Sequence, residues 1–501
     1  MRQALHIFKK DVRRLWFEIA IAITVVGAFT FTGARRALWL MAPATNRIAA
    51  WTLVMILLPL TWWTLIARVI HDEALPGDSQ FWITRPYSWK SLLGAKALFI
   101  LAFINLPMLL ADGVIVRAYG FPLGAELPGL LWSQVLLAIA FVLPIAALSA
   151  LTSGFVQLIF AILTPCVIAL GVAIIAPEVV LGAFVGGGSD WVKAYYVFLV
   201  ISIAASAILV WQYSMRRTAA ARSLAVTTGI LAVLGMMLIP WSAAFRIQAW
   251  LSKQRVDQSL DHVEFDLGSR WLTRAVIEGG ERVRVELPLN ITGLPLGMIA
   301  KPEGFSVQLQ ASDGTMWQAD QLPLRHTSNM GQEFSLQATL DGAFYRKVKE
   351  APIKVRGSLY LTLFGNRQTA RVPFGDRSVP VRRVGVCSAS GGANRQSYFL
   401  ICSSAFRFPS VLVSYSFIQP AKEGVQDVRS STQPRTISYS PFPAELGISP
   451  VSQDFTFSTV YVPLAEARVE TVEALAHIRR NFEIDNLRLG DFEVRPAPVS
   501  Q

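Results

Sequence analysis

Few residues of this sequence have the types and spacing that catalysis or metal binding requires. The serines of "CSASGG" (387–392) lie among small residues, but they lack the GxSxG spacing and the strand-to-helix context of a nucleophile. The three cysteines form no CxxC pair and the five histidines are dispersed, so the pattern indicates no zinc ligand set. No spacing joins Asp, Glu and His residues into a catalytic pair. We therefore expect neither an enzyme nor a metal site in this chain.

Cys387 and Cys402 have a different potential chemistry, which is a covalent cross-link. They flank "SASGGANRQSYFLI", whose centre at 391–394 is typical of a hairpin turn. In an antiparallel pair of strands the two sulfurs would lie opposite each other, and outside the cytoplasm they would oxidise readily. The sequence therefore predicts a disulfide. The alternative is a pair of buried free thiols.

Two acidic residues, Glu18 and Asp112, stand inside apolar stretches, where an ionised group is costly in hydrocarbon. Asp112 would suit the lining of an intramembrane cavity or gate. The simpler interpretation is that Glu18 extends to the inner membrane surface and that Asp112 extends to the outer headgroups. Both residues are candidate intramembrane polar sites.

The composition is typical of a membrane protein. Of the 501 residues 53% are hydrophobic and 16% are charged, whereas about a quarter of the residues of a soluble chain are charged. The net charge is +12, but Lys and Arg are scattered rather than gathered with interleaved aromatic residues. We therefore expect basic flanks of membrane spans and no binding of nucleic acid.

Apolar runs of about 20 residues indicate membrane spans. Seven such runs are present, at 15–33, 48–66, 97–116, 129–151, 155–176, 194–213 and 224–245. The first run exceeds a signal-peptide core and no small-x-small cleavage site follows before Arg35, so we interpret it as a retained span. Pro144 and Pro165 should kink the fourth and fifth spans. Lys and Arg concentrate in the loops on the side of the N-terminus, which predicts a cytoplasmic N-terminus and an outer location for everything after Phe245.

After about residue 246, alternation of apolar and polar residues predicts half-buried strands. The alternating stretches are 262–267, 282–291, 305–310, 353–363 and 410–417. Asp313-Gly314 and Asp341-Gly342 are typical of turns, and the tail "AHIRRNFEIDNLRLGDFEV" (476–494) is expected to pass from a helix end or bend into closing strands. The predicted fold class is a polytopic α-helical membrane domain of about seven spans followed by an all-β, sandwich-like soluble domain. The predicted units are an amphipathic interfacial helix (1–14), a transmembrane domain (15–245) and an extracytoplasmic domain of one or two β-sandwiches (246–501).

Two segments on the predicted cytoplasmic side have features beyond those of simple membrane spans. Residues 1–14 place apolar residues on one helical side and Lys and Arg on the rest, which is typical of a helix in the headgroup layer. The loop from 71 to 96 contains a Gly-Asp-Ser turn, the aromatic pair Phe81 and Trp82, an Arg-Pro stop and a new helix start. Aromatic residues alone would serve as membrane anchors. The turn, the Arg-Pro pair and the new helix start exceed what an anchor requires, and they favour a docking surface for a cytoplasmic partner.

The stretch "GDSQFWITRPYSWKSLLGAK" (77–96) resembles the cytoplasmic loop of type-two ABC transporter permeases. In that family a Gly-rich turn, a short coupling helix and a Pro-Ser pair precede a Lys that opens the third span. The matching positions are Gly77, Phe81, Trp82, Thr84, Arg85, Pro86, Ser88, Gly94 and Lys96. The resemblance covers roughly residues 1–213.

The resemblance implies that the loop docks in a groove of a separate ATPase subunit. Phe81, Trp82 and Arg85 would make the coupling contact, and Glu73 would help to position the loop. A second permease subunit, identical or different, would complete the translocation path in the lipid membrane. ATP and Mg²⁺ would bind to the ATPase subunit, so this chain would need no cofactor of its own.

A seventh span and an outer β domain depart from the six spans that are usual in the family. The resemblance therefore implies no role for the β domain, which would either stabilise a dimer or handle substrate or an envelope partner. The expected function is that of a permease subunit moving an unknown substrate across the cytoplasmic (inner) membrane. The alternative is a membrane-anchored envelope sensor or assembly module, which binds a ligand through its β domain and needs no ATPase.

Overall fold

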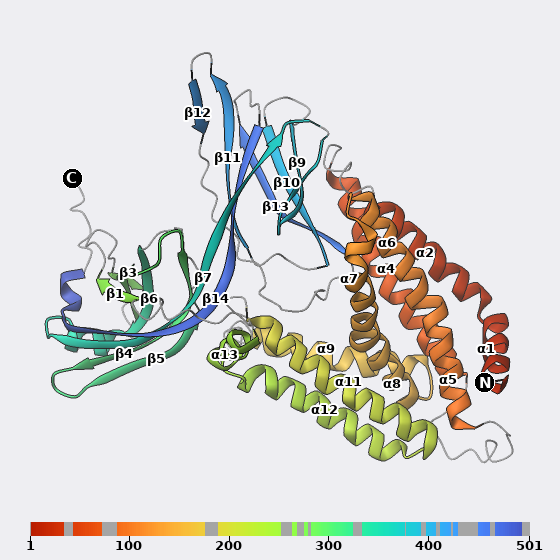
Figure 1. Ribbon diagram of the computed structural model, residues 1–501. Helices are drawn as coiled ribbons and strands as arrows, with labels where there is room; N and C mark the ends of the chain where they lie inside the picture. Colours follow the sequence, from red (N-terminus) through yellow and green to blue (C-terminus); the bar gives the residue numbers. More distant parts are fainter. Residues whose placement is uncertain are drawn as a thin grey trace.

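The first half of the chain is helical. The computed structural model describes residues 2–34, 44–72, 88–175, 189–251, 263–267, 275–278, 282–323, 333–375, 377–391, 397–406, 411–421, 424–428, 449–460 and 466–492. Its helices are α1 (Arg2–Arg14), α2 (Trp16–Ala34), α4 (Ala44–His71), α5 (Trp89–Ile100), α6 (Leu106–Ala118), α7 (Leu123–Leu137), α8 (Leu143–Leu151), α9 (Phe155–Ile175), α11 (Asp190–Ser214), α12 (Thr218–Leu238) and α13 (Trp241–Leu251) (Figure 1).

Six stretches of helix among the described residues are long and apolar enough to cross a membrane. They are Trp16–Ala34, Thr52–His71, Trp89–Ala118, Leu123–Leu151, Trp191–Ser214 and Thr218–Leu238. α9 adds a shorter apolar stretch, Phe155–Ile168, at the position of the fifth predicted span. Phe29, Trp62, Leu65 and Phe99 are fully buried between these helices and form the centre of the helical core. The helices therefore indicate a membrane protein.

Two of these stretches contain a widened π-helical turn. η2 (Leu101–Asn105) joins α5 to α6, and η3 (Ala138–Val142) joins α7 to α8. A proline follows each turn, Pro107 in α6 and Pro144 in α8. Proline has no N–H group and its ring displaces the carbonyl four residues earlier, which here lies inside the π turn. The sequence predicts a kink at Pro144, and the structure has the distortion in η3, just before that proline.

The seventh predicted span, 224–245, is divided in the structure. α12 ends at Leu238 and the separate helix α13 begins at Trp241, because Pro240 between them cannot continue the hydrogen-bond ladder. α13 packs against the β-rich region. The rings of Trp241 and Phe245 lie 5.1 Å and 5.3 Å from the ring of Tyr360. α13 is therefore one contact between the two parts of the molecule; Phe406 and Val451 of the β-rich region also pack in the helical core.

The second half of the chain is β-rich, in agreement with the alternating pattern. Its strands are β1 (Glu264–Leu267), β2 (Ala275–Glu278), β3 (Arg282–Thr292), β4 (Ile299–Ala311), β5 (Met316–Pro323), β6 (Glu333–Asp341), β7 (Ile353–Pro373), β8 (Val379–Val381), β9 (Gly385–Gly391), β10 (Ser397–Ala405), β11 (Val411–Ala421), β12 (Gly424–Val428), β13 (Val451–Val460) and β14 (Glu466–Leu487). All strand pairs between them are antiparallel. A short helix, α14 (Gly342–Val348), follows β6.

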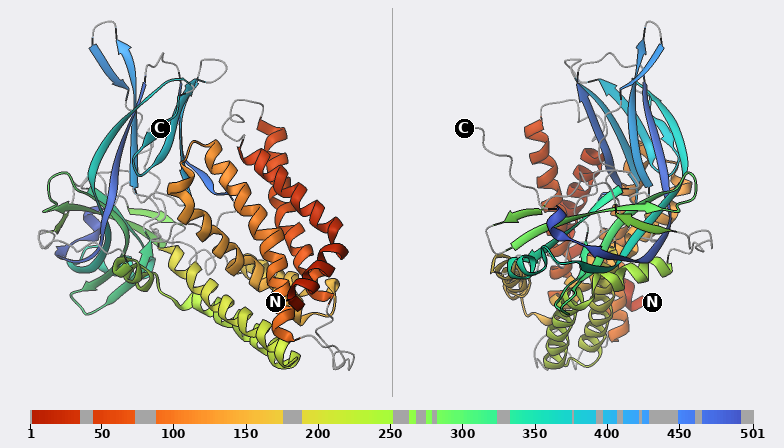
Figure 2. Two further views of the ribbon diagram at one scale, coloured as in Figure 1. Left: turned by 45° about the vertical axis from the view of Figure 1, so that its right-hand side comes forward. Right: turned by 90° about the vertical axis from the view of Figure 1, so that its left-hand side faces the viewer.

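The strands form three sheets, and two long strands connect the whole region. One sheet has the order β1-β3-β2 with β6 beside β3, the second has the order β13-β10-β9-β8, and the third has the order β12-β11-β14-β7-β4-β5. The third sheet packs on the first through residues such as Leu289 and Leu361, and on the second through residues such as Val413 and Leu400. We call it the shared sheet. β7 and β14 run side by side through its whole length (Figures 1 and 2).

One local prediction in this region is wrong, and another is right only in part. Asp341 does not form a turn with Gly342; it is the N-cap of α14, and its carboxylate accepts a hydrogen bond from the N–H of Ala343. The tail at 476–487 contains no helix end, but the closing strand expected there is confirmed as the second half of β14. Register shifts between Thr471 and Glu473, between Ala474 and Ala476 and between Ile484 and Leu487 interrupt the alternation of β14 before and within this tail.

The predicted disulfide is confirmed. Cys387 and Cys402 are directly opposite partners in the β9–β10 pair and are bonded. Both are fully buried in the core between the shared sheet and the second sheet. Because disulfides persist in oxidising compartments, the bond fits an extracytoplasmic β-rich region.

The state of the cysteines gives a direct test. Protein that is unfolded in denaturant without reductant should take up one alkyl group, at Cys166, which is the free cysteine in α9. After reduction it should take up three. Intact-mass spectrometry distinguishes the two results. Three alkyl groups before reduction would show that Cys387 and Cys402 are thiols in the isolated protein.

Candidate functional site

The candidate site is the end of the helical part that flanks residues 73–87. Seven residues of the predicted coupling loop lie outside the described residues: Glu73, Gly77, Phe81, Trp82, Thr84, Arg85 and Pro86. The flanks of the loop are described. α4 ends at His71, and α5 begins at Trp89 after the N-cap Ser88, whose hydroxyl accepts a hydrogen bond from the N–H of Ser91 at 3.2 Å.

α1 lies against α5, the helix that follows the loop. The ring of Phe8 stacks on Phe103 and meets Phe99 edge to face, with centroid distances of 6.0 Å and 6.4 Å. At the start of α5 the hydroxyl of Ser91 donates to the side-chain oxygen of Gln3 at 3.4 Å. The apolar side of α1 thus faces α5 and η2, which follow the loop.

A buried ion pair fixes this contact. The ammonium group of Lys96 lies 2.8 Å from a carboxylate oxygen of Asp11, and the two side chains are 2% and 1% exposed. Each of these charges would be very costly to bury without the other. The pair therefore joins α1 to α5 at a buried point of contact. Lys96 is the residue of the predicted coupling set that the structure describes.

Two further ion pairs lie at α4 and Asp72, the part of the chain that precedes the loop. Arg14, at the end of α1, lies 2.8 Å from Asp72, whose side chain is 11% exposed. Arg68 in α4 lies 3.0 Å from Glu18 in α2. Glu18, a candidate intramembrane polar residue, therefore has a basic partner in the structure. α1 and its neighbour α2 contact both α4 before the loop and α5 after it.

The turn between α8 and α9 joins the same end of the helical part. The side chain of His71 lies 3.1 Å from the hydroxyl of Thr152, and the guanidinium group of Arg222 donates to the carbonyl oxygen of Leu151 at 3.0 Å and 3.3 Å. α4, the α8–α9 turn and the start of α12 are therefore linked by polar contacts.

The other candidate polar residue, Asp112, belongs to a separate cluster. It is 3% exposed in α6, and one of its oxygens accepts hydrogen bonds from Ser133 at 3.4 Å and Gln134 at 3.3 Å in α7. Asn105 in η2 donates to the backbone carbonyl of Gln134 at 3.3 Å. The cluster joins α6 to α7. The carboxylate thus has polar partners within the helical part.

The contacts that the structure describes at the candidate site are ion pairs, hydrogen bonds and aromatic packing between helices. No group of three or more His, Cys, Asp and Glu side chains among the described residues is arranged to hold a metal ion. The assignment of Lys96 to the coupling loop stays a prediction, and sequence reasoning missed the ion pairs made by Asp11, Arg14, Asp72 and Arg68. The pairing of Asp11 with Lys96 spans 85 positions, and local spacing contains no signal for such a contact.

Comparison of the sequence with protein-family models and with curated proteins finds no match.

Proposed function

We propose that this chain is the membrane-spanning permease subunit of an ATP-driven transporter, similar to the type-two ABC permeases, with the ATPase supplied by a separate subunit. The observation that carries the proposal is the attachment of both flanks of residues 73–87 to α1. Asp72 before the loop binds Arg14, and Lys96 after it binds Asp11. A force applied to a loop held in this way moves α4, α5 and α1 together, and this is what an energy-supplying partner requires.

The proposal includes an orientation in the cytoplasmic membrane. The N-terminus, α1 and the loop face the cytoplasm, and the β-rich region lies outside. The distribution of Lys and Arg and the Cys387–Cys402 bond support this orientation. A second permease subunit completes the translocation path. The outward apolar side chains of α9, among them Val156, Phe160 and Val167, offer a surface for lipid or for that subunit.

The coupling contact can be tested with the double variant Phe81→Ala/Trp82→Ala. We expect the variant to insert in the membrane normally, because neither residue belongs to a span. It should lose most of the copurifying ATPase and at least about tenfold of the ATP hydrolysis in the purified complex, since aromatic anchors dominate such interfaces. Affinity purification from native membranes followed by an ATPase assay measures both quantities.

A matched control removes the same two side-chain types elsewhere. Trp16 and Phe17 are adjacent in α2 and are 66% and 59% exposed. The variant Trp16→Ala/Phe17→Ala should retain the ATPase subunit and its activity. Full ATPase binding and activity in the Phe81→Ala/Trp82→Ala variant would show that the coupling assignment is wrong. If no ATP-hydrolysing protein copurifies with the unmodified chain, the proposed function itself fails.

A further inference from the structure

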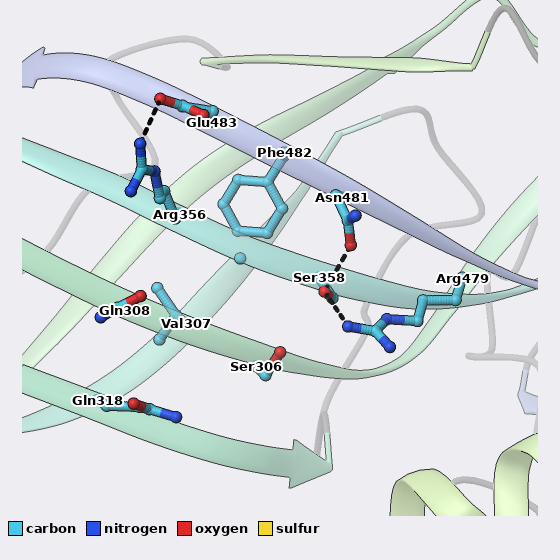
Figure 3. A pocket seen from close by; sticks show the side chains of 11 residues that line it. Ser306, Val307, Gln308, Gln318, Arg356, Ser358, Arg479, Asn481, Phe482 and Glu483 are labelled. Carbon is cyan, nitrogen blue, oxygen red and sulfur yellow. Dashed lines mark hydrogen bonds and ion pairs between the residues drawn. The ribbon is translucent and has the colours of Figure 1, made fainter.

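A polar cavity of about 480 Å³ lies on the shared sheet, across β5, β4, β7 and β14. Figure 3 shows the side chains that line it. The strand register explains why they gather there, since residues two apart on one strand point to the same face. Two neighbouring cross-strand rows supply most of the lining: Gln318–Gln308–Arg356–Glu483 and Ser306–Ser358–Asn481.

The inference depends on Arg479, which lies in the next row along the same face. Its cross-strand partner in that row is Tyr360. The guanidinium group of Arg479 donates a hydrogen bond to the hydroxyl of Ser358 at 2.9 Å and lies 5.7 Å from the centre of the Tyr360 ring. Among the described residues it forms no ion pair. Its position over the ring holds the planar group at the edge of the cavity, where its other N–H groups can bind an oxyanion.

Among the described residues, the acidic side chains at the Glu483 end of the cavity are paired with basic ones. Glu483 forms ion pairs with Lys354 and Arg356, and Asp485 lies 3.2 Å from Lys354. Two carboxylates thus oppose two basic side chains at this end of the cavity, and among the described residues the positive charge of Arg479 is in excess. The hydroxyl and amide groups of the lining add neutral hydrogen-bond donors. This chemistry suits a phosphate-type anion.

The cavity lies beside the helix that connects the sheet to the membrane part. Tyr360 and His477 occupy the same face of the shared sheet as Arg479, and both contact Phe245 of α13. α13 follows the membrane helix α12 after a two-residue break. Away from the sheet α13 exposes Ile247 and Trp250, which are 43% and 80% exposed. An exposed tryptophan on a short helix next to a span is typical of the membrane–water interface, where lipid headgroups lie.

We propose that this cavity binds the phosphate-bearing head group of a membrane lipid, with Arg479 as the main anionic contact and α13 against the lipid surface. The inference does not depend on the proposed transport function. It uses the register of the sheet, the charge balance of the cavity and its position beside α13. A free phosphate ion would have the same chemistry, so the test must separate the two sources.

The test is a titration of the full-length, detergent-solubilised chain, followed by native mass spectrometry. The probes are a short-chain phosphatidylglycerol, a short-chain phosphatidylcholine of the same length, glycerol 3-phosphate and inorganic phosphate. The unmodified chain should bind phosphatidylglycerol in preference to the other three probes. Arg479→Gln should weaken that binding about tenfold, which is the usual effect of losing a charge-assisted hydrogen bond.

Two further variants make the result decisive. Arg371→Gln removes the same type of side chain from β7 at a position outside the cavity, where Arg371 is 74% exposed and paired with Glu466. It should bind phosphatidylglycerol as the unmodified chain does. Arg356→Gln tests the opposite end of the cavity and should also weaken binding. Equal binding by Arg479→Gln and Arg371→Gln would overturn the proposal, and equal affinity for inorganic phosphate and phosphatidylglycerol would overturn the assignment to a lipid.

Discussion

Replacing Lys96 with alanine is expected to destabilise the helical part by about 3–5 kcal/mol, because the carboxylate of Asp11 would remain buried without its cationic partner. Asp11→Ala should have an effect of the same size, since it leaves the ammonium group in the same position. The two side chains are 1% and 2% exposed, so water cannot replace the missing partner without a rearrangement of α1. Unfolding of the purified protein in a denaturing detergent titration, followed by circular dichroism, measures the change.

A double variant and a matched control separate charge from packing. Asp11→Leu/Lys96→Met removes both charges together and should cost much less than either single change, because paired apolar side chains can replace a buried ion pair. Arg68→Ala breaks the more exposed pair with Glu18, in which Arg68 is 62% exposed, and should cost about 1 kcal/mol or less. If Lys96→Ala costs no more than Arg68→Ala, the pair does not determine the position of α1.

Acidification from pH 7 to pH 4 is expected to weaken the junction between α13 and the shared sheet through His477. Burial lowers the pKa of His477 to about 4, whereas an exposed imidazole titrates near 6.5. Above pH 6.5 the ring is neutral in both the folded and the unfolded chain, and the native contacts are fully present. As the pH falls from about 6.5 to 4, the unfolded chain takes up a proton that the folded chain does not, so stability decreases by about 3 kcal/mol in total.

The neighbours of His477 show where this loss would occur. Its ring lies 3.0 Å from the hydroxyl of Thr362 and 3.3 Å from the side-chain amide of Gln248, which accepts a hydrogen bond from Trp191 of α11 at 3.2 Å. Phe245 covers the ring edge to face. Protonation would place a charge in this contact between α13 and β14.

Thermal unfolding of the unmodified chain and of His477→Gln between pH 7.5 and pH 4 is the corresponding measurement. The glutamine keeps hydrogen-bonding capacity but cannot titrate. The midpoint of the unmodified chain should fall more steeply below pH 6.5 than that of the variant, because carboxylates elsewhere affect both proteins equally. Parallel curves for the two proteins would contradict the assignment of the acid sensitivity to His477.

Much of the fold could be predicted because lipid and the alternating strand pattern impose strong local rules. An apolar run of about 20 residues has few structural choices in a bilayer, so the helices lie close to the predicted spans. The hairpin signal between Cys387 and Cys402 is likewise local. β14 was only partly recognised, because its register shifts break the period of two that defines a strand.

The sites depend on contacts between distant positions. Asp11 was missed as the partner of Lys96 because an acidic residue in a basic helix is usually exposed to solvent. The cavity beside Arg479 brings together side chains from four strands that are separated by loops and by a helix. Their alternation with buried residues predicts only that they face away from the core. Which of them become neighbours is set by strand order and register, which no single segment of the sequence specifies.

The length of β7 and β14 has a mechanical consequence. These strands contain 21 and 22 residues, so each extends for roughly 70 Å at about 3.3 Å per residue. The contact with α13, at Tyr360 and His477, lies near the middle of this ladder beside the cavity, and the end of the ladder at residues 466–473 pairs with β11. The part of the ladder between this contact and the β11 end therefore forms an arm, and a small tilt of α13 would move the tip of that arm through a larger distance. The bulges near residues 471–476 are the natural bending points of this arm.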